Sequence, residues 1–149
     1  MKKFLILIIL FLFLLGFLYN PCNKTFTTPK GKSFRARSEH AAKQVEFLSE
    51  IAKDNLPRLC LEKQDPLYDK LGRCTQSKLQ NTSWREIVEF TNSGLYGYNL
   101  DKGDEIGIKL YDWRGRPLSK KVIVDTLLHE LAHSCTVSWG HGEEFKKVF

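Results

Sequence analysis

The sequence DTLLHELAHSC, residues 125–135, decides the fold and the chemistry expected of this chain. It lies in an apolar run that is typical of a buried helix, and it contains the pattern H-E-x-x-H at His129, Glu130 and His133. Residues four apart lie on one face of a helix, ~6 Å apart along the axis, so His129 and His133 can face one ion. Glu130 lies ~100° around the helix from His129, where it can reach a metal-bound water without binding the metal. The pattern predicts a zinc hydrolase site with two imidazole ligands and a carboxylate general base.

A third protein ligand is expected, because catalytic zinc usually has three protein ligands and one open position. His141 is the nearest candidate, eight residues after His133, and a glycine on either side of it would let the chain turn sharply. Metzincins have the third histidine six residues after the second and a methionine-containing turn below the metal. Here the spacing is eight residues and the only methionine is Met1, which excludes the metzincin pattern. Three of the four histidines fall between positions 129 and 141, which favours His129, His133 and His141 as the metal ligands. Alternative ligands are Glu143 and Glu144.

The net charge of +6 is concentrated near the N-terminus. Lys2 and Lys3 supply two charges and the stretch 24–37 supplies five, whereas the residues from Ser38 onward carry 16 basic and 17 acidic side chains. The body of the chain is therefore nearly neutral. Positive charge on both sides of an apolar N-terminus is typical of a segment at a membrane surface.

Residues 4–19 form an apolar run, slightly shorter than the ~20 residues of a full membrane span. No small-residue cleavage site follows, so we expect a single-pass anchor, with a cleaved signal peptide as the alternative. The basic residues after the run slightly favour a domain on the cytoplasmic side. The sequence thus predicts a hydrophobic anchor helix in residues 1–21, a basic linker in residues 22–37 and a catalytic domain in residues 38–149.

The pattern of the remaining chain indicates an α+β domain. Ser38 is a predicted N-cap for a helix that ends near residues 55–57. Residues 62–83 are predicted to be a loop, residues 84–90 a strand and residues 91–99 turns. Alternating apolar residues predict a strand at 104–111, either an edge with which an extended substrate pairs or an ordinary sheet strand. A turn at 112–117 and a cap at Ser119 precede the active-site helix.

The four cysteines match no zinc-binding spacing. In an oxidising compartment Cys60 and Cys74 could pair, whereas in the cytosol all four would be thiols. Cys135 is predicted to be a small core residue.

Three stretches together resemble the WLM (Wss1-like metalloprotease) domain, a relative of the SprT and Spartan proteases. They are GYNLDKGDEIGIKLY at 97–111, VDTLLHELAHS at 124–134 and GHGEEF at 140–145. The resemblance covers roughly residues 84–149. It implies zinc ligands at His129, His133 and His141 and a catalytic glutamate at Glu130. The spacing between the second and third histidines is two residues longer than in the usual pattern.

These observations predict a small zincin-like domain that binds Zn²⁺, hydrolyses peptide bonds in protein or peptide substrates and is anchored in a membrane through residues 4–19. Glu130 would take a proton from the metal-activated water and return it to the leaving amine. One alternative is the family's role, a DNA-stimulated protease that acts on DNA–protein crosslinks, with nucleic acid contacting the basic stretch 24–37. Another is a catalytically idle zinc-binding module. Candidate donors to the oxyanion are Tyr96, Tyr98 and Tyr111.

Overall fold

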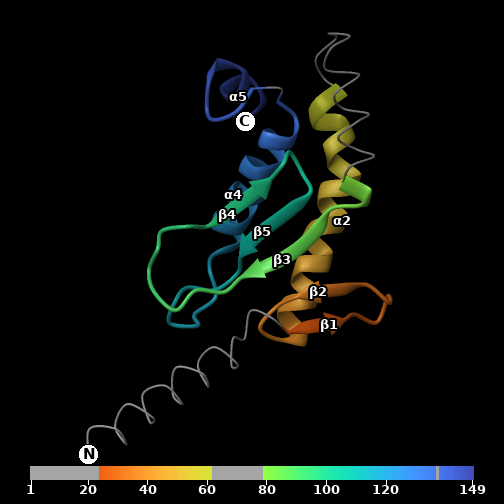
Figure 1. Cartoon of the computed structure of the whole chain (residues 1–149), viewed down its shortest axis with the longest axis vertical. Coiled ribbons are helices and arrows are strands. Elements are labelled where there is room, and N and C mark those ends of the chain that lie inside the picture. The colour runs from red at the N-terminus through yellow and green to blue at the C-terminus, as the bar shows by residue number, and fades with distance from the viewer. Residues whose placement is uncertain (1–23, 62–78, 137) are drawn as a thin grey trace, which may run out of the picture.

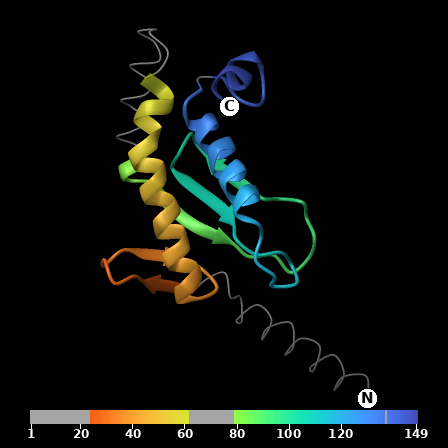
Figure 2. The same cartoon turned by 180° about the vertical axis from the view of Figure 1, so that it is seen from behind.

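The computed structural model describes residues 24–61, 79–136 and 138–149. In this part of the chain, two long helices pack on one face of a five-stranded sheet, which confirms the predicted α+β class (Figures 1 and 2). The strands are β1 (Thr25–Thr27), β2 (Ser33–Arg35), β3 (Ser83–Ile87), β4 (Gly97–Leu100) and β5 (Glu105–Lys109). The helices are α2 (Glu39–Leu61), α4 (Lys120–Ser134) and the short α5 (Glu143–Val148).

The order of the strands in the sheet is β1-β2-β3-β5-β4. The inner pairs β2–β3 and β3–β5 are parallel, and the outer pairs β1–β2 and β4–β5 are antiparallel. The strand predicted at 104–111 is present as β5, but it lies between β3 and β4. It is therefore an ordinary inner strand, and the edge strand that contacts α4 is β4.

The sequence pattern predicted turns where β4 forms. Gly97-Tyr98-Asn99-Leu100 is short and lacks the β-branched residues that mark a strand. Its pairing with β5 depends on a tight turn in which Asp101 (φ 45°) and Lys102 (φ 61°) have left-handed backbone conformations. The N–H of Gly103 donates to the carbonyl of Leu100 at 3.0 Å and closes this turn. The sequence Asp-Lys-Gly before an alternating strand was the available signal for the hairpin.

The first long helix, α2, begins as predicted. The Ser38 hydroxyl accepts a hydrogen bond from the N–H of Ala41 at 3.1 Å, which satisfies one backbone donor of the first turn. The helix continues to Leu61, past the predicted end near residues 55–57. A proline inside a helix, such as Pro57, removes one backbone donor and crowds the carbonyl four residues before it, which can kink a helix without ending it.

The core lies between the sheet and the two long helices. Trp84 of β3 pairs in register with Ile106 of β5, and both side chains are buried. Their apolar surface, together with that of α2 and α4, supplies the main driving force for folding. The buried apolar cluster contains Phe34, Ala36, Ala41, Ala42, Val45, Leu48, Ala52, Leu79, Trp84, Ile106, Ile108, Leu110, Leu127, Leu131 and Cys135.

Residues 24–37, predicted as part of a basic linker, instead form the β1–β2 hairpin at one edge of the sheet. Lys30 and Lys32 lie 2.8 Å and 3.4 Å from the carboxylate of Glu50 on α2. Arg37 pairs with Glu86 on β3. Three of the basic residues that suggested contact with phosphates are therefore engaged with carboxylates of the same chain.

The predicted single-pass membrane localisation requires correction. No helix among the described residues is long and apolar enough to span a bilayer, so a membrane anchor is not supported. The segment on which that prediction rested, residues 4–19, lies outside the described residues. The Cys60–Cys74 pair that an oxidising compartment would allow also falls on side chains outside them.

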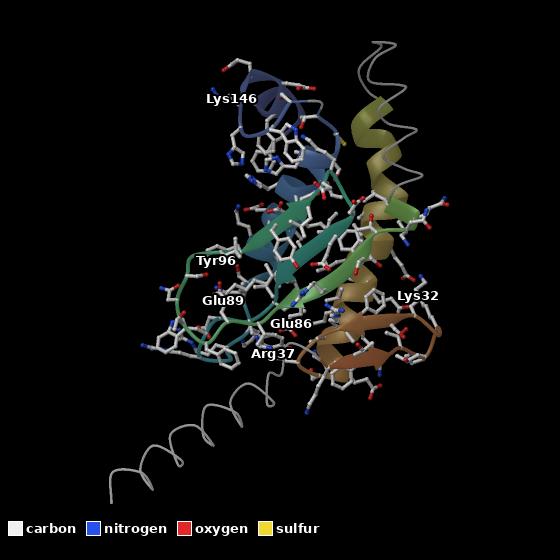
Figure 3. The ribbon with its side chains drawn as sticks, in the orientation of Figure 1. Lys32, Arg37, Glu86, Glu89, Tyr96 and Lys146 are labelled. Carbon is white, nitrogen blue, oxygen red and sulfur yellow. The ribbon has the colours of Figure 1, made fainter. Side chains whose placement is uncertain are left out.

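An ion pair joins the start of α2 to the middle of the sheet (Figure 3). The Glu86 carboxylate is buried, and it accepts hydrogen bonds from the backbone N–H of Arg37 at 2.7 Å and from its Nε at 2.5 Å. Burial raises the pKa of Glu86, while the bonds from Arg37 oppose that shift. The Arg37 guanidinium also lies 4.6 Å from the centre of the Tyr111 ring.

We predict that Glu86→Ala lowers the free energy of unfolding by about 3 kcal/mol, because it leaves a largely buried guanidinium without its anion. Urea unfolding would measure the change. Glu39→Ala, which removes an exposed carboxylate paired with Lys43 on the same helix, is the control and should have a much smaller effect. Equal losses in the two variants would contradict the prediction.

Candidate metal centre

The helix α4, which carries the H-E-x-x-H motif, begins at Lys120, directly after the predicted cap. The Ser119 hydroxyl accepts a hydrogen bond from the N–H of Val122 at 3.3 Å. Helical geometry then places His129 and His133 one turn apart on the face directed towards α5, and their ring centres are 5.0 Å apart.

The structure brings the three predicted histidines together. Nε2 of His141 lies 2.9 Å from Nε2 of His129 and 3.1 Å from Nε2 of His133. Among the described residues, these three form the one group of potential metal ligands, with ligand atoms all within 4.8 Å of one another. His141 comes from the loop between α4 and α5, so the site closes only when the chain turns back over the helix.

This arrangement fits a zinc ion. Tetrahedral coordination with zinc–nitrogen bonds of ~2.0–2.1 Å separates the ligand nitrogens by ~3.3 Å. The two Nε2 separations of 2.9 Å and 3.1 Å are close to this value. Three imidazoles would also leave one position of a tetrahedron for water or substrate.

The alternative ligands Glu143 and Glu144 have other partners. Glu143 lies 2.7 Å from the ammonium of Lys146 on the same short helix. Glu144 accepts hydrogen bonds from the N–H and the hydroxyl of Ser138. Neither carboxylate joins the three-histidine group.

The surroundings favour neutral imidazoles, the form that binds a metal. Burial lowers the pKa of His133 to about 4, with further lowering by the neighbouring histidines and by the positive charge of Lys102. Burial, and then the proximity of His141, also lowers the pKa of His129. The aromatic ring of Phe145, which is buried, packs 4.5 Å from the His133 ring and 4.9 Å from the His129 ring.

Glu130 lies beside the histidines and is 6% exposed. Burial raises the pKa of its carboxyl to about 7. A carboxyl group with a pKa near neutrality can both accept and return a proton at that pH. The residue borders both halves of the cleft described below.

The edge strand β4 packs closely against α4 at Glu130. A Cβ atom at Gly97 would lie 2.6 Å from Cγ2 of Thr126 and 2.7 Å from Oε1 of Glu130. Two positions further along β4, Nδ2 of Asn99 donates to the backbone carbonyl of Glu130 and to the hydroxyl of Ser134, both at 2.6 Å. Gly97 and Asn99 are site residues that the sequence analysis missed, since the H-E-x-x-H motif says nothing about the strand that packs on it.

A cleft runs between β4 and α4 and divides into two halves at the candidate metal ligands. One half, about 510 Å³, is mainly apolar. The other, about 270 Å³, contains the three histidines and a lysine. The first half is lined by Gly94, Leu95, Tyr96, Gly97, Val122, Asp125, Thr126, His129, Glu130 and Phe149. The second is lined by Gly97, Tyr98, Asn99, Lys102, His129, Glu130, His133, Trp139 and His141.

The three tyrosines suggested as oxyanion donors have different surroundings. The Tyr111 hydroxyl lies 3.4 Å from Oε1 of Gln44, away from the cleft. Tyr98 borders the cleft, but its hydroxyl donates to Glu105 at 2.5 Å, and burial raises its pKa. Tyr96, labelled in Figure 3, lines the apolar half. Its ring centre lies 5.0 Å from the ammonium of Lys109. Tyr96 is thus the tyrosine best placed to meet a ligand in the cleft.

Cys135, directly after α4, is buried as the sequence predicts. It is also disulfide-bonded, which the sequence analysis did not foresee. The disulfide adds a covalent constraint to the chain directly after α4.

The family model of the WLM domain matches residues 70–148, more than half of the chain. The chain belongs to the WLM domain family. The crystal structure of Wss1 from Saccharomyces cerevisiae is similar over 55% of this chain and 64% of that one, with 21% identity and a TM-score of 0.41. A mutant of Wss1 gives 21% identity and a TM-score of 0.40, over 55% of this chain and 69% of that one. No curated protein matched the chain.

Membership of the WLM family indicates a domain of the zinc metalloprotease type. The matched region contains the whole of α4 and the three histidines. The chain spans 64% of the length of the Wss1 structure.

We predict that Gly97→Ala lowers the free energy of unfolding by about 1–3 kcal/mol, because the added methyl group forces β4 and α4 apart. Urea unfolding of the metal-free protein would measure this change. Gly142→Ala is the matched control, because a Cβ atom there meets nothing within 4 Å. Unchanged stability of the Gly97 variant would show that β4 and α4 do not pack as closely as described.

Proposed function

We propose that this protein is a zinc-dependent endopeptidase with a zincin-like catalytic domain in residues 38–149, extended at one edge of the sheet by the β1–β2 hairpin. The observation that carries the proposal is the convergence of three imidazole Nε2 atoms beside a buried carboxyl group at the centre of a cleft. His129, His133 and His141 would hold the ion, and Glu130 would be the general base.

A zinc ion held by three imidazoles supplies a Lewis acid that lowers the pKa of water to ~7 and polarises a carbonyl group. The residues of the chain transfer the proton and position the groups that react. Glu130 accepts the proton of the attacking water and transfers it to the nitrogen of the leaving amine. Gly97 and Asn99 keep that carboxyl group beside the histidines through the contacts of β4 with α4.

The position of β4 supports an extended peptide as substrate. Among the described residues, β4 is the last strand of the sheet, and one of its edges is paired, with β5. A peptide added to the other edge would continue the sheet and pass over the cleft. We propose that backbone hydrogen bonds to β4 supply affinity and that side chains of the substrate enter the two halves of the cleft.

The two alternatives receive less support. A DNA-stimulated protease would use the basic stretch 24–37, but Lys30, Lys32 and Arg37 are paired with carboxylates. A purely structural zinc site normally fills all four coordination positions with protein ligands. The group found among the described residues contains three.

We predict that Glu130→Gln binds zinc as the wild type does but loses cleavage of unfolded casein by at least ~10²-fold, because an amide cannot accept the proton of water. Metal analysis and the rate of cleavage by the full chain would test this. Glu143→Gln, a change of the same type at an exposed position on α5, should retain activity. Retained cleavage in the Glu130 variant would refute the role assigned to Glu130.

We also predict that His141→Ala weakens zinc binding by more than ~100-fold, beyond what loss of an outer partner of a ligand costs. Competition with a chromophoric chelator would measure the affinity. His40→Ala removes the fourth histidine, which is exposed at the start of α2, and should leave affinity unchanged. Equal affinity of both variants would exclude His141 as a ligand.

A further inference from the structure

His141, the third candidate ligand, lies outside the regular secondary structure. His129 and His133 are fixed by α4, whereas His141 lies on the exposed loop between α4 and α5. Gly140, directly before it, has a left-handed backbone (φ 85°) that permits the turn. Ordering such a loop costs conformational entropy. The position of His141 relative to His129 and His133 therefore depends on the contacts that hold this loop.

Ser138, three residues before His141, is held from two sides by opposite charges. Its backbone N–H donates to Oε2 of Glu144 at 2.9 Å, and its hydroxyl donates to the same oxygen at 2.5 Å. Its backbone carbonyl accepts a hydrogen bond from the ammonium of Lys102 at 2.5 Å. Hydrogen bonds to charged groups are about twice as strong as those between neutral groups.

Lys102 reaches this loop from a distant part of the fold, the turn between β4 and β5. Its ammonium also donates to the hydroxyl of Thr136 at 3.1 Å and lies 4.9 Å from the centre of the Trp139 ring. Its left-handed backbone (φ 61°) is uncommon for a lysine and stores strain that the surrounding contacts must offset. One lysine thus contacts three residues of the loop that carries His141.

We propose that Lys102 and Glu144 are positioning residues for the metal centre. They hold Ser138 between them and thereby keep His141 within reach of His129 and His133. This inference rests on the proposed function, in which the three histidines bind zinc. Neither residue is a ligand. They order the imidazole of His141 before the ion binds, so that zinc binding does not include the entropic cost of ordering this loop.

The first test is the zinc affinity of Lys102→Met in the full chain. Methionine keeps a long apolar side chain but removes the charge and all three donors. We expect zinc to bind about 10–100-fold more weakly, the cost usual for loss of a group that orients a ligand. Chelator competition would measure the affinity. Lys102→Arg keeps the charge and donors and should restore a large part of it.

A spectroscopic readout separates positioning from general destabilisation. Cobalt(II) in place of zinc reports coordination by three imidazoles through its visible absorption, independently of turnover. We expect the Lys102→Met spectrum to change relative to the wild type. Lys146→Met on α5, whose ammonium pairs with Glu143, is the matched control and should leave both affinity and spectrum unchanged.

Glu144→Gln provides an independent variant on the other side of Ser138. We expect a loss of affinity in the same direction. Because both residues act on Ser138, the double variant should lose less than the product of the two single losses. A strictly multiplicative loss would indicate that the two residues do not share Ser138 as their point of action and would overturn the proposal.

The outcomes distinguish the two levels of inference. If the wild-type chain binds no zinc, the proposed function fails, and this inference fails with it. If the wild type binds zinc and the Lys102→Met and Glu144→Gln variants bind it equally well, only the positioning role is overturned. Unchanged zinc affinity with a raised KM in the Lys102 variant would likewise overturn it, because that result assigns Lys102 to substrate binding.

Discussion

The packing of β4 on α4 at Gly97 is the contact on which the site depends. Because Gly97 has no side chain, the strand approaches the helix so closely that any larger residue would overlap Thr126 and Glu130. Asn99 then fixes the register of strand and helix through two short hydrogen bonds from one amide group. Glu130 is enclosed as a result, and its burial raises the pKa of the carboxyl group to about 7.

The same contact sets the shape of the cleft. The helices α2 and α4 cover one face of the sheet, as Figure 2 shows. β4 is added at the edge, antiparallel to β5, and it borders the cleft along its length. The apolar half and the histidine-containing half meet at Gly97, His129 and Glu130, so a peptide lying along β4 would place one of its bonds beside the candidate metal ligands.

Several charged side chains in this fold join elements that are distant in sequence. Arg37 and Glu86 connect the start of α2 to the sheet, and Lys102 connects the β4–β5 turn to the loop after α4. The lysines of the β1–β2 hairpin are similarly directed to Glu50 on α2. Basic composition alone therefore does not identify a partner, since three of the five basic residues in 24–37 pair with carboxylates of the same chain.

The sequence by itself determined the helix α4, its cap at Ser119 and the three histidines, because helical periodicity and the H-E-x-x-H spacing are local properties. It also determined the α+β class and the inner strand β5, whose apolar residues alternate. It did not predict β4, because four residues with little strand propensity become a strand only when β5 and α4 lie beside them. Nor did it predict that residues 24–37 form two strands, since their basic side chains find carboxylates that are distant in sequence. The tertiary structure alone decided that Gly97, Asn99 and Lys102 lie against α4 and the loop after it, because each makes a contact with a residue about 30 positions or more away along the chain.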